Sequence, residues 1–242
     1  MSEVLLRVDG VSKRFGGFTA LEGISVDIRP GERFGLIGPN GSGKTTLINC
    51  ISGVLPSDGG SIRFNGEDIT RLPAYKRTRR GIARSFQVPR PFRSMTVLEN
   101  LLVAIDFAVI GHGLSTRQAD AEVFAILDKI GLAGKAHVAS SRLSQVELRK
   151  MELARAMAAR PKLLISDEAM AGLAGSEVDE VLDVLLKLNA EGITVIMIEH
   201  IMQAVMRFSE RVMCLDAGRV ICEGSPQKVM ADKGVQEAYL GA

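Results

Sequence analysis

Nine consecutive residues, starting at Gly38, have the types and spacing of a segment that binds nucleotide phosphates. The segment fits a glycine, four variable residues and then Gly-Lys-Thr, and it stands between an apolar strand-like run and a helix-like run. Backbone N–H groups in such a loop can surround a phosphate, and the following helix N terminus adds positive partial charge. We expect this phosphate loop (residues 38–46) to bind ATP through Gly38, Pro39, Asn40, Gly41, Ser42, Gly43, Lys44, Thr45 and Thr46.

Two side chains of the phosphate loop have distinct expected roles. The ammonium group of Lys44 is placed to reach the β- and γ-phosphates, and the hydroxyl of Thr45 is placed to ligate Mg²⁺. The alternative is a glycine-rich turn that fits the pattern by chance. A complete match between a strand and a helix argues against that alternative.

Two acids, Asp167 and Glu168, follow a second apolar run at residues 163–165. Asp167 is predicted to hold Mg²⁺ through water, and Glu168 to orient and deprotonate the attacking water. Two acids that merely end a strand at the surface are the alternative interpretation. The complete phosphate loop upstream favours the functional one.

His200 follows a third apolar run, at residues 194–198. A lone histidine is more often structural, but ligands collect at the carboxyl ends of parallel strands in α/β sheets. We therefore predict that His200 senses the γ-phosphate. His112 and His137 lie in loop-like sequence and have no predicted role.

Strand-like and helix-like segments alternate along the chain, which is typical of an α/β fold. The predicted strands cover residues 4–8, 24–28, 34–37, 62–64, 163–165, 194–198, 212–215 and 219–222. The predicted helices cover residues 43–53, 96–132, 144–160 and 176–189. We expect one domain over residues 1–242, with a P-loop NTPase core (1–90 and 160–242), an antiparallel β portion near the N terminus and an inserted α-helical lobe at about 91–159.

The composition is that of a globular enzyme. Hydrophobic residues make up 46% and charged residues 24% of the 242 residues, and the net charge of +2 gives no general signal for nucleic acid. The longest apolar region, residues 95–114, is interrupted by Glu99 and Asp106 and is too polar to cross a bilayer. The three cysteines have no zinc-ligand spacing and are expected to be reduced.

The order of the motifs resembles that of ABC transporter ATPase subunits over nearly the whole chain. An aromatic residue (Phe15) precedes the phosphate loop, and Gln87, Leu143-Ser144, Asp167-Glu168 and His200 follow it. The segments that look like the branched-chain amino-acid importer group are residues 15–17, 20–21, 84–87, 95–100, 171–173, 198–200 and 238–241. The lipopolysaccharide-export ATPase is a close relative of this group and the second choice.

The resemblance implies a role for three further residues. Phe15 would stack on adenine, and Gln87 would touch Mg²⁺ or the attacking water and transmit its position to the membrane subunit. Ser144 of one chain would close over ATP bound to another, so a second ATPase subunit, identical or different, is expected.

The resemblance also implies partners and a location. The partners are integral-membrane permease subunits and a periplasmic solute-binding protein, with no nucleic acid. The location is the cytoplasmic face of the inner membrane, held peripherally. The activity would be Mg²⁺-dependent ATP hydrolysis that drives import of branched-chain or related amino acids or small organic acids.

The signature Leu-Ser-Gly-Gly-Gln of this family reads Leu-Ser-Gln-Val-Glu here. Side chains at Gln145 and Val146 replace two glycines, and Ser144 with Glu147 also fits a helix-capping box. Ala169 and Ala174 replace a proline and an aspartate of the family. These departures predict a slow homodimer and a heterodimer with a second ATPase, and they leave a weakly hydrolysing regulatory subunit open.

Two further classes of P-loop protein share the phosphate loop. A small-molecule or nucleotide kinase would give no reason for Gln87, the Leu-Ser helix or His200. A mechanical ATPase of DNA would carry long heptad coiled coils, which this sequence lacks.

A run of basic residues separates the phosphate loop from the predicted helical lobe. Its members are Arg71, Lys76, Arg77, Arg79, Arg80, Arg84, Arg90 and Arg93. A solvated helix face is one interpretation, and a surface for anionic headgroups or an acidic loop of a membrane subunit is the other.

Overall fold

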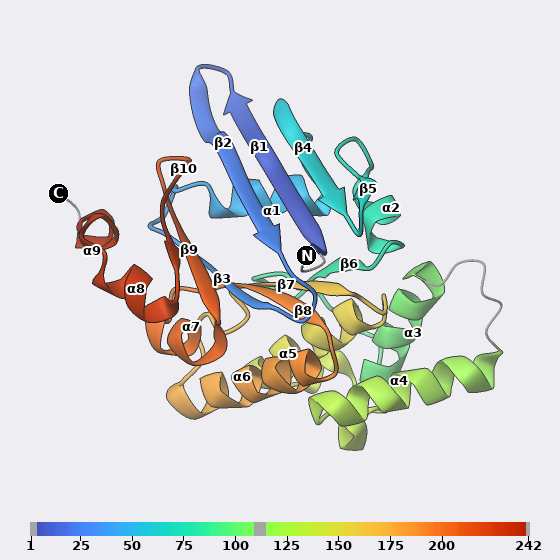
Figure 1. Ribbon diagram of the computed structural model, residues 1–242. Helices are drawn as coiled ribbons and strands as arrows, with labels where there is room; N and C mark the ends of the chain where they lie inside the picture. Colours follow the sequence, from blue (N-terminus) through green and yellow to red (C-terminus); the bar gives the residue numbers. More distant parts are fainter. Residues whose placement is uncertain (1–3, 109–114, 241–242) are drawn as a thin grey trace.

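The computed structural model describes residues 4–108 and 115–240, which form two sheets and a set of helices (Figure 1). The smaller sheet is antiparallel, as expected, with the strand order β2-β1-β4-β5. Its strands are β1 (Leu6–Phe15), β2 (Phe18–Ile28), β4 (Gly59–Phe64) and β5 (Glu67–Asp68). The predicted strands at 4–8 and 24–28 were therefore correct in type but too short, because buried and exposed residues alternate imperfectly along these long strands.

The larger sheet has the strand order β10-β9-β3-β8-β7-β6. All neighbouring pairs are parallel except β9 with β10, which form a hairpin. Its strands are β3 (Arg33–Ile37), β6 (Ile82–Arg84), β7 (Leu163–Asp167), β8 (Thr194–Ile198), β9 (Arg211–Asp216) and β10 (Arg219–Gly224). Strand β6 was not predicted, because three residues are too few to show a period.

The helices of the described residues have the following bounds. They are α1 (Lys44–Ser52), α2 (Ala74–Thr78), α3 (Val97–Ala108), α4 (Thr116–Ile130), α5 (Gln145–Met157), α6 (Gly175–Ala190), α7 (Met202–Phe208), α8 (Pro226–Ala231) and α9 (Lys233–Leu240), with 3₁₀ turns at Ala133–Lys135 and Ser140–Arg142. The helical segment predicted at 96–132 contains two helices, because Ser115 and Gln118 form a capping box that begins α4. Residues 109–114 of that segment lie outside the described residues.

The larger sheet is buried on both faces, which explains its nearly continuous apolar strands. Successive side chains of β7 point to opposite faces, so Leu163 and Ile165 join one core and Leu164 joins the other. The first core also holds residues of α1 and of the antiparallel sheet. The second holds residues of α3–α6, and Figure 1 shows these helices on that side of the sheet.

Helix α1 begins and ends where its glycines predicted. Gly43 and Gly53 flank it with φ of 106° and 79°, the left-handed region that glycine adopts without strain. The β9–β10 hairpin also turns at the expected place, through Ala217 and Gly218, both with positive φ.

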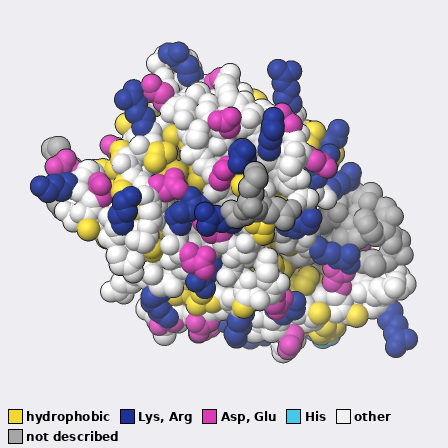
Figure 2. Space-filling model, in the orientation of Figure 1, with side chains coloured by type: hydrophobic (Ala, Val, Ile, Leu, Met, Phe, Trp, Pro, Cys, Tyr) yellow, Lys and Arg dark blue, Asp and Glu magenta, His cyan; other side chains and the backbone are white. Residues whose placement is uncertain are grey.

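Two residues of the predicted basic surface, Arg77 and Arg84, are buried or largely buried, so the hypothesis is wrong for them. Arg77 is 1% exposed, and its guanidinium donates to the backbone carbonyl oxygens of Cys50, Ile51, Thr70 and Leu72. It therefore satisfies the last turn of α1. Arg84 is also largely buried and pairs with Asp167 at 2.6 Å. Across the face in Figure 2, Lys and Arg are interspersed with Asp and Glu.

Two smaller observations complete the fold. Within residues 4–108 and 115–240, no helix combines the length and the apolar character needed to cross a bilayer. Cys50, Cys214 and Cys222 are free and buried, as the sequence predicted. The division of the chain into a core and a helical lobe at about 91–159 remains a prediction.

Candidate nucleotide site

The phosphate loop connects β3 to α1, as predicted. Its backbone shape depends on glycine at specific points: Gly38 has φ of 146°, and a Cβ there would lie 2.1 Å from the carbonyl oxygen of Leu215. At Gly43, with φ of 106°, a Cβ would lie 2.7 Å from the carbonyl oxygen of Ala20. The loop is thus packed against the β9–β10 turn and the start of β2, and side chains are excluded where the backbone must turn inward.

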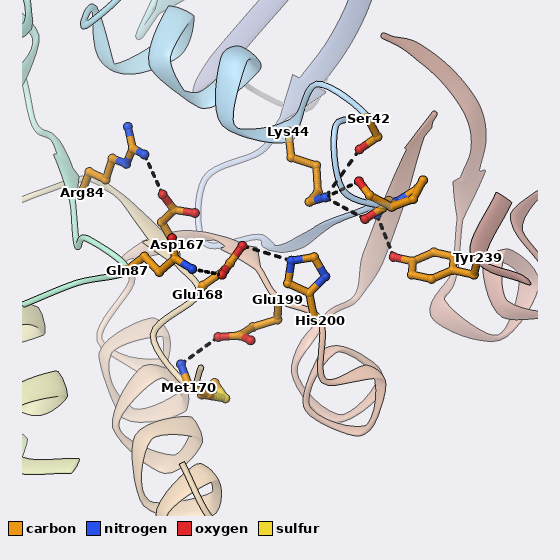
Figure 3. Close-up of polar contacts among 12 residues, drawn as sticks. Ser42, Lys44, Arg84, Gln87, Asp167, Glu168, Met170, Glu199, His200 and Tyr239 are labelled. Atoms are coloured by element: carbon orange, nitrogen blue, oxygen red, sulfur yellow. Dashed lines mark hydrogen bonds and ion pairs between the residues drawn. The ribbon is translucent and has the colours of Figure 1, made fainter. Parts of the chain in front are cut away.

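Lys44 is the first residue of α1 and is 6% exposed. Its Nζ donates to the carbonyl oxygens of Gly38 at 2.6 Å and Pro39 at 2.9 Å, so it lies across the loop (Figure 3). Burial lowers the pKa of Lys44, while the negative charge of Glu168 raises it. The third hydrogen-bond partner of Lys44 is the Ser42 hydroxyl at 3.5 Å, and a buried ammonium group whose hydrogen-bond partners are all neutral is suited to receive an anion.

Gln87, Glu168 and His200 meet beside this loop, and we call them the strand-end group. Gln87 Nε2 donates to Glu168 Oε2 at 2.5 Å, and His200 Nε2 lies 3.0 Å from Glu168 Oε1 (Figure 3). Gln87, Glu168 and His200 follow β6, β7 and β8, which are adjacent and parallel, so their carboxyl ends share one edge. The structure therefore brings together three residues that the sequence placed 32 or more positions apart.

The backbone at Glu168 adopts a conformation uncommon for a residue other than glycine. Its φ is 47°, and its N–H donates to the carbonyl oxygen of Ile198 at 2.9 Å. Left-handed backbone at such residues concentrates in functional sites, where the surroundings hold it. This turn directs the carboxylate away from the end of β7 and between Gln87 and His200.

Asp167 ends β7 and is 6% exposed. Arg84 bridges it to α1, donating to Asp167 Oδ2 at 2.6 Å and to Asn49 Oδ1 at 2.6 Å. Thr45, Gln87 and Asp167 line one cavity of about 460 Å³. Hydroxyl, amide and carboxylate oxygens are the ligands that Mg²⁺ accepts, so the donor set fits this ion. The pairing with Arg84 suits a carboxylate that acts through water.

Ser144 caps α5 with the geometry of a capping box. Its N–H donates to Glu147 Oε2 at 2.9 Å, and its Oγ accepts from the Glu147 N–H at 3.4 Å. Within the described residues, Ser144 makes no hydrogen bond to the phosphate loop. A role at ATP would therefore require another chain.

The two side chains that replace the signature glycines face different ways. Val146 is 9% exposed and belongs to the second core, whereas Gln145 is exposed. Helical geometry accounts for the difference, because successive positions of a helix point to different sides. The amide of Gln145 lies near Gly172, 3.1 Å from the position of a Cβ there.

Phe15 is the last residue of β1 and is 47% exposed. It pairs across the hairpin with Phe18, and Lys13 Nζ lies 5.6 Å from its ring centroid. An accessible ring is what stacking on a base requires. Its predicted contact with adenine stays a prediction.

Comparison with known proteins now decides the family. A family described as "ABC transporter" matches residues 21–171, and one described as "Branched-chain amino acid ATP-binding cassette transporter" matches residues 219–242. The high-affinity branched-chain amino acid transport ATP-binding protein BraF of Pseudomonas aeruginosa is 36% identical over 253 residues, covering 100% of this chain and 99% of BraF. This chain belongs to the ATP-binding proteins of ABC transporters, in their branched-chain amino acid group.

Two solved structures show the same fold. The ADP conformation of MJ1267, an ATP-binding cassette of an ABC transporter, has a TM-score of 0.89 and 34% identity and covers 99% of each chain. A dimeric post-hydrolysis state of the cassette MJ0796, bound to ADP and Pi, has a TM-score of 0.81 and 25% identity and covers 92% of this chain and 99% of that one. The expected ABC ATPase fold and family are confirmed, and the chain is an ABC transporter ATPase.

The cassette has a buried acid at its site that the sequence analysis passed over. Glu199, 1% exposed, accepts the Met170 N–H at 2.9 Å and so connects the His200 loop to the segment after Glu168 (Figure 3). The pKa of Glu199 is raised to about 7, chiefly by burial and also by the negative charge of Glu168, while hydrogen bonds from the Met170 and His200 backbone and the charge of Arg149 oppose the rise. The sequence did contain a sign of this residue's importance, because Glu199 directly precedes His200, the predicted γ-phosphate sensor.

Arg149 of the cassette was also missed. It is 8% exposed in α5 and donates to the carbonyl oxygens of Gln87 and Ala171, the latter at 2.9 Å. It therefore ties the signature helix to both loops that flank Glu168. Little in the sequence pointed to these contacts. Arg149 lies on a helix face with apolar neighbours, but an arginine at such a position is usually exposed to solvent.

Proposed function

We propose that this cassette hydrolyses Mg-ATP to drive import of branched-chain or related amino acids or small organic acids. The observation that carries the chemistry is the meeting of Gln87, Glu168 and His200 beside the phosphate loop. The match of residues 219–242 to the branched-chain family and the similarity to the branched-chain amino acid transport protein BraF support the substrate class.

The phosphate loop is proposed to hold the triphosphate. Lys44 would exchange its carbonyl partners for phosphate oxygens, a stronger, charge-assisted pairing. The N terminus of α1 and the loop amides surround the same anion. Phe15, exposed at the hairpin of the antiparallel sheet, is proposed to stack on the adenine.

Glu168 is proposed to act as the general base for the attacking water. Its two carboxylate oxygens are oriented by Gln87 on one side and His200 on the other. His200 is proposed to contact the γ-phosphate, and Gln87 to hold the water or the metal ion. Loss of such a base typically lowers the rate by about 10²–10⁴-fold.

Thr45, Gln87 and Asp167 are proposed to hold Mg²⁺, since they line one cavity. The ion supplies positive charge that neutralises the oxygens of the transferred phosphoryl group. Arg84 keeps Asp167 in place at the end of β7.

A second ATPase subunit is proposed to complete each site. Ser144 caps a helix that contributes no hydrogen bond to the phosphate loop within the described part of its own chain. The dimeric structure of MJ0796 supports a pairing of two cassettes. The second cassette is a copy of this chain or a different one.

A cavity of about 600 Å³ beside Gln87 is the proposed docking site for a membrane permease. Its lining combines Phe86 and Phe107, 51% and 69% exposed, with apolar parts of α3 and α5. Of its charged residues, Arg84 is paired with Asp167 and Arg155 with Glu152, so the positive charge of Arg79 is what favours an apolar helix that carries an acid. A permease bound there, together with a periplasmic solute-binding protein on the other side, would place this chain at the cytoplasmic face of the membrane.

The test is reconstitution of this cassette with the permeases and binding protein encoded beside it. Proteoliposomes that contain Mg-ATP should accumulate radiolabelled leucine or a related solute, and Glu168→Gln in the cassette should stop uptake. ATP-dependent extraction of lipopolysaccharide without solute uptake would support the export ATPase instead. No ATPase activity with any partner would support a regulatory subunit.

A further inference from the structure

The last helix of the chain touches the first residue of the phosphate loop. The hydroxyl of Tyr239, on α9, accepts the Gly38 N–H at 2.8 Å, across 201 residues of sequence (Figure 3). The two residues are far apart in the sequence and meet at the carboxyl end of β3.

Helix α9 is fixed by packing. Val235 of α9 is 2% exposed and joins Val229 of α8 and residues of β9 and β10 in a small core of their own. The Val235 N–H also donates to Asp232 Oδ1 at 3.1 Å at the start of the helix. The backbone that carries Tyr239 is therefore held by buried contacts, while the Tyr239 residue itself is 39% exposed.

Gly38 is held by two side chains, one on each of its backbone groups. Tyr239 holds its N–H, and Lys44 holds its carbonyl oxygen at 2.6 Å. The space around its Cα is closed by Leu215, whose carbonyl oxygen would lie 2.1 Å from a Cβ. A shift of Gly38 would therefore displace the backbone where β3 leads into the phosphate loop.

We propose that Tyr239 is a positioning residue for nucleotide binding, which makes the C-terminal helix part of the ATP site. When a phosphate draws Lys44 away, Gly38 loses the bond on its carbonyl oxygen and keeps the one from Tyr239. The hydroxyl of Tyr239 therefore matters most in the nucleotide-bound state. This inference rests on the proposed binding of ATP by the phosphate loop.

The environment of the hydroxyl suits this role. Burial raises the pKa of Tyr239 to about 12, so the phenol stays neutral at physiological pH. A neutral phenol places no negative charge beside the phosphate site, and its lone pair remains available to the Gly38 N–H.

The test compares Tyr239→Phe with Tyr75→Phe, the other tyrosine of the chain, which lies exposed in α2. Each variant loses one oxygen atom and keeps its ring. The dissociation constants of ADP and ATP are measured by titration, KM and kcat by steady-state hydrolysis, and the melting temperature without nucleotide.

Tyr239→Phe should weaken ADP and ATP binding about fivefold, the change expected from one hydrogen bond of average net strength. KM for ATP should rise with it while kcat stays near the parent value, the pattern of lost uniform binding. Tyr75→Phe should bind nucleotide like the parent.

Two outcomes would overturn the inference. Parent-like affinity in Tyr239→Phe would show that the bond does not affect the loop. A lowered melting temperature with unchanged affinity would show that the bond only stabilises the fold. A parent protein that fails to bind ATP would instead refute the proposed function, so the two failures are distinguishable.

Discussion

The phosphate loop and the strand-end group lie at the same end of the larger sheet but are held by different means. The phosphate loop is shaped by backbone: at Gly38 and Gly43 an added Cβ would collide with neighbouring carbonyl oxygens. The strand-end group is shaped by side chains, since Glu168 is positioned by Gln87 and His200 from two other loops.

This difference separates the expected effects of substitutions. Substitutions in the phosphate loop should weaken nucleotide binding, because the shape of its backbone is set locally by its glycines. Changes in the strand-end group and its neighbours should act on hydrolysis or on pH dependence, because several side chains share the positioning.

Lys44→Ala should nearly abolish ATP binding. The substitution removes a buried ammonium group that spans the loop and would meet the phosphates. Binding of a labelled ATP analogue at equilibrium is the measurement. Lys76→Ala, at an exposed position of α2, is the control and should leave affinity unchanged. Parent-like affinity in Lys44→Ala would mean that the loop is not the nucleotide site.

Glu199→Gln should change how stability depends on pH. The carboxyl ionises near pKa 4.5 when unfolded and near 7 when folded, so the folded chain binds the extra proton between these values. The free energy of unfolding of the parent should therefore fall, relative to the variant, as pH rises from about 4.5 to about 7. The difference is about 3 kcal/mol at most.

Denaturant unfolding at pH 5 and pH 8 measures this difference. The amide of glutamine can still accept the Met170 N–H, so the variant isolates the charge. Glu237→Gln, on the exposed side of α9, should follow the parent at both pH values. If the free energies of unfolding of the parent and of Glu199→Gln differ by the same amount at pH 5 and at pH 8, the raised pKa of Glu199 is refuted.

Phe15→Ala should weaken ATP binding by about 1–3 kcal/mol, the scale of base–aromatic stacking. GTP should be affected similarly, because stacking does not read the edge of the base. Phe18→Ala, across the same hairpin, is the matched control and should have a much smaller effect. Equal losses in both variants would point to the hairpin as a whole, and a loss for ATP alone would exclude simple stacking.

Gln145→Gly should raise the ATPase rate of the homodimer only slightly, well below the roughly 10²-fold that one preorganised donor contributes. The reason is that Val146 is buried and the Gln145 amide lies near Gly172 of its own chain. Steady-state ATPase of the isolated chain is the measurement. A rise of roughly 10²-fold would instead indicate that the signature is impaired and that the chain works in a heterodimer.

The phosphate loop and α1 could be predicted from sequence because their determinants are local. Gly38, Lys44 and the flanking glycines specify a turn and a helix within a few residues. The carboxyl ends of β7 and β8 were predictable for the same reason, since each strand is a short apolar run followed by polar residues.

The contacts that complete the site depend on strand order and could not be predicted. Gln87 reaches Glu168 because β6 is the neighbour of β7, and β6 is too short to be recognised. The bonds from Arg149 to Gln87 and from Tyr239 to Gly38 join segments 62 and 201 residues apart. No pattern within either segment specifies such pairs.

The role of Glu168 is the claim on which the account depends most. Its direct test is to measure ATP affinity and ATP hydrolysis together in the parent and in Glu168→Gln. We predict unchanged affinity, hydrolysis lower by roughly 10²-fold or more, and an ATP-bound dimer that accumulates on size-exclusion chromatography. Turnover of ATP by Glu168→Gln at the parent rate would contradict the account.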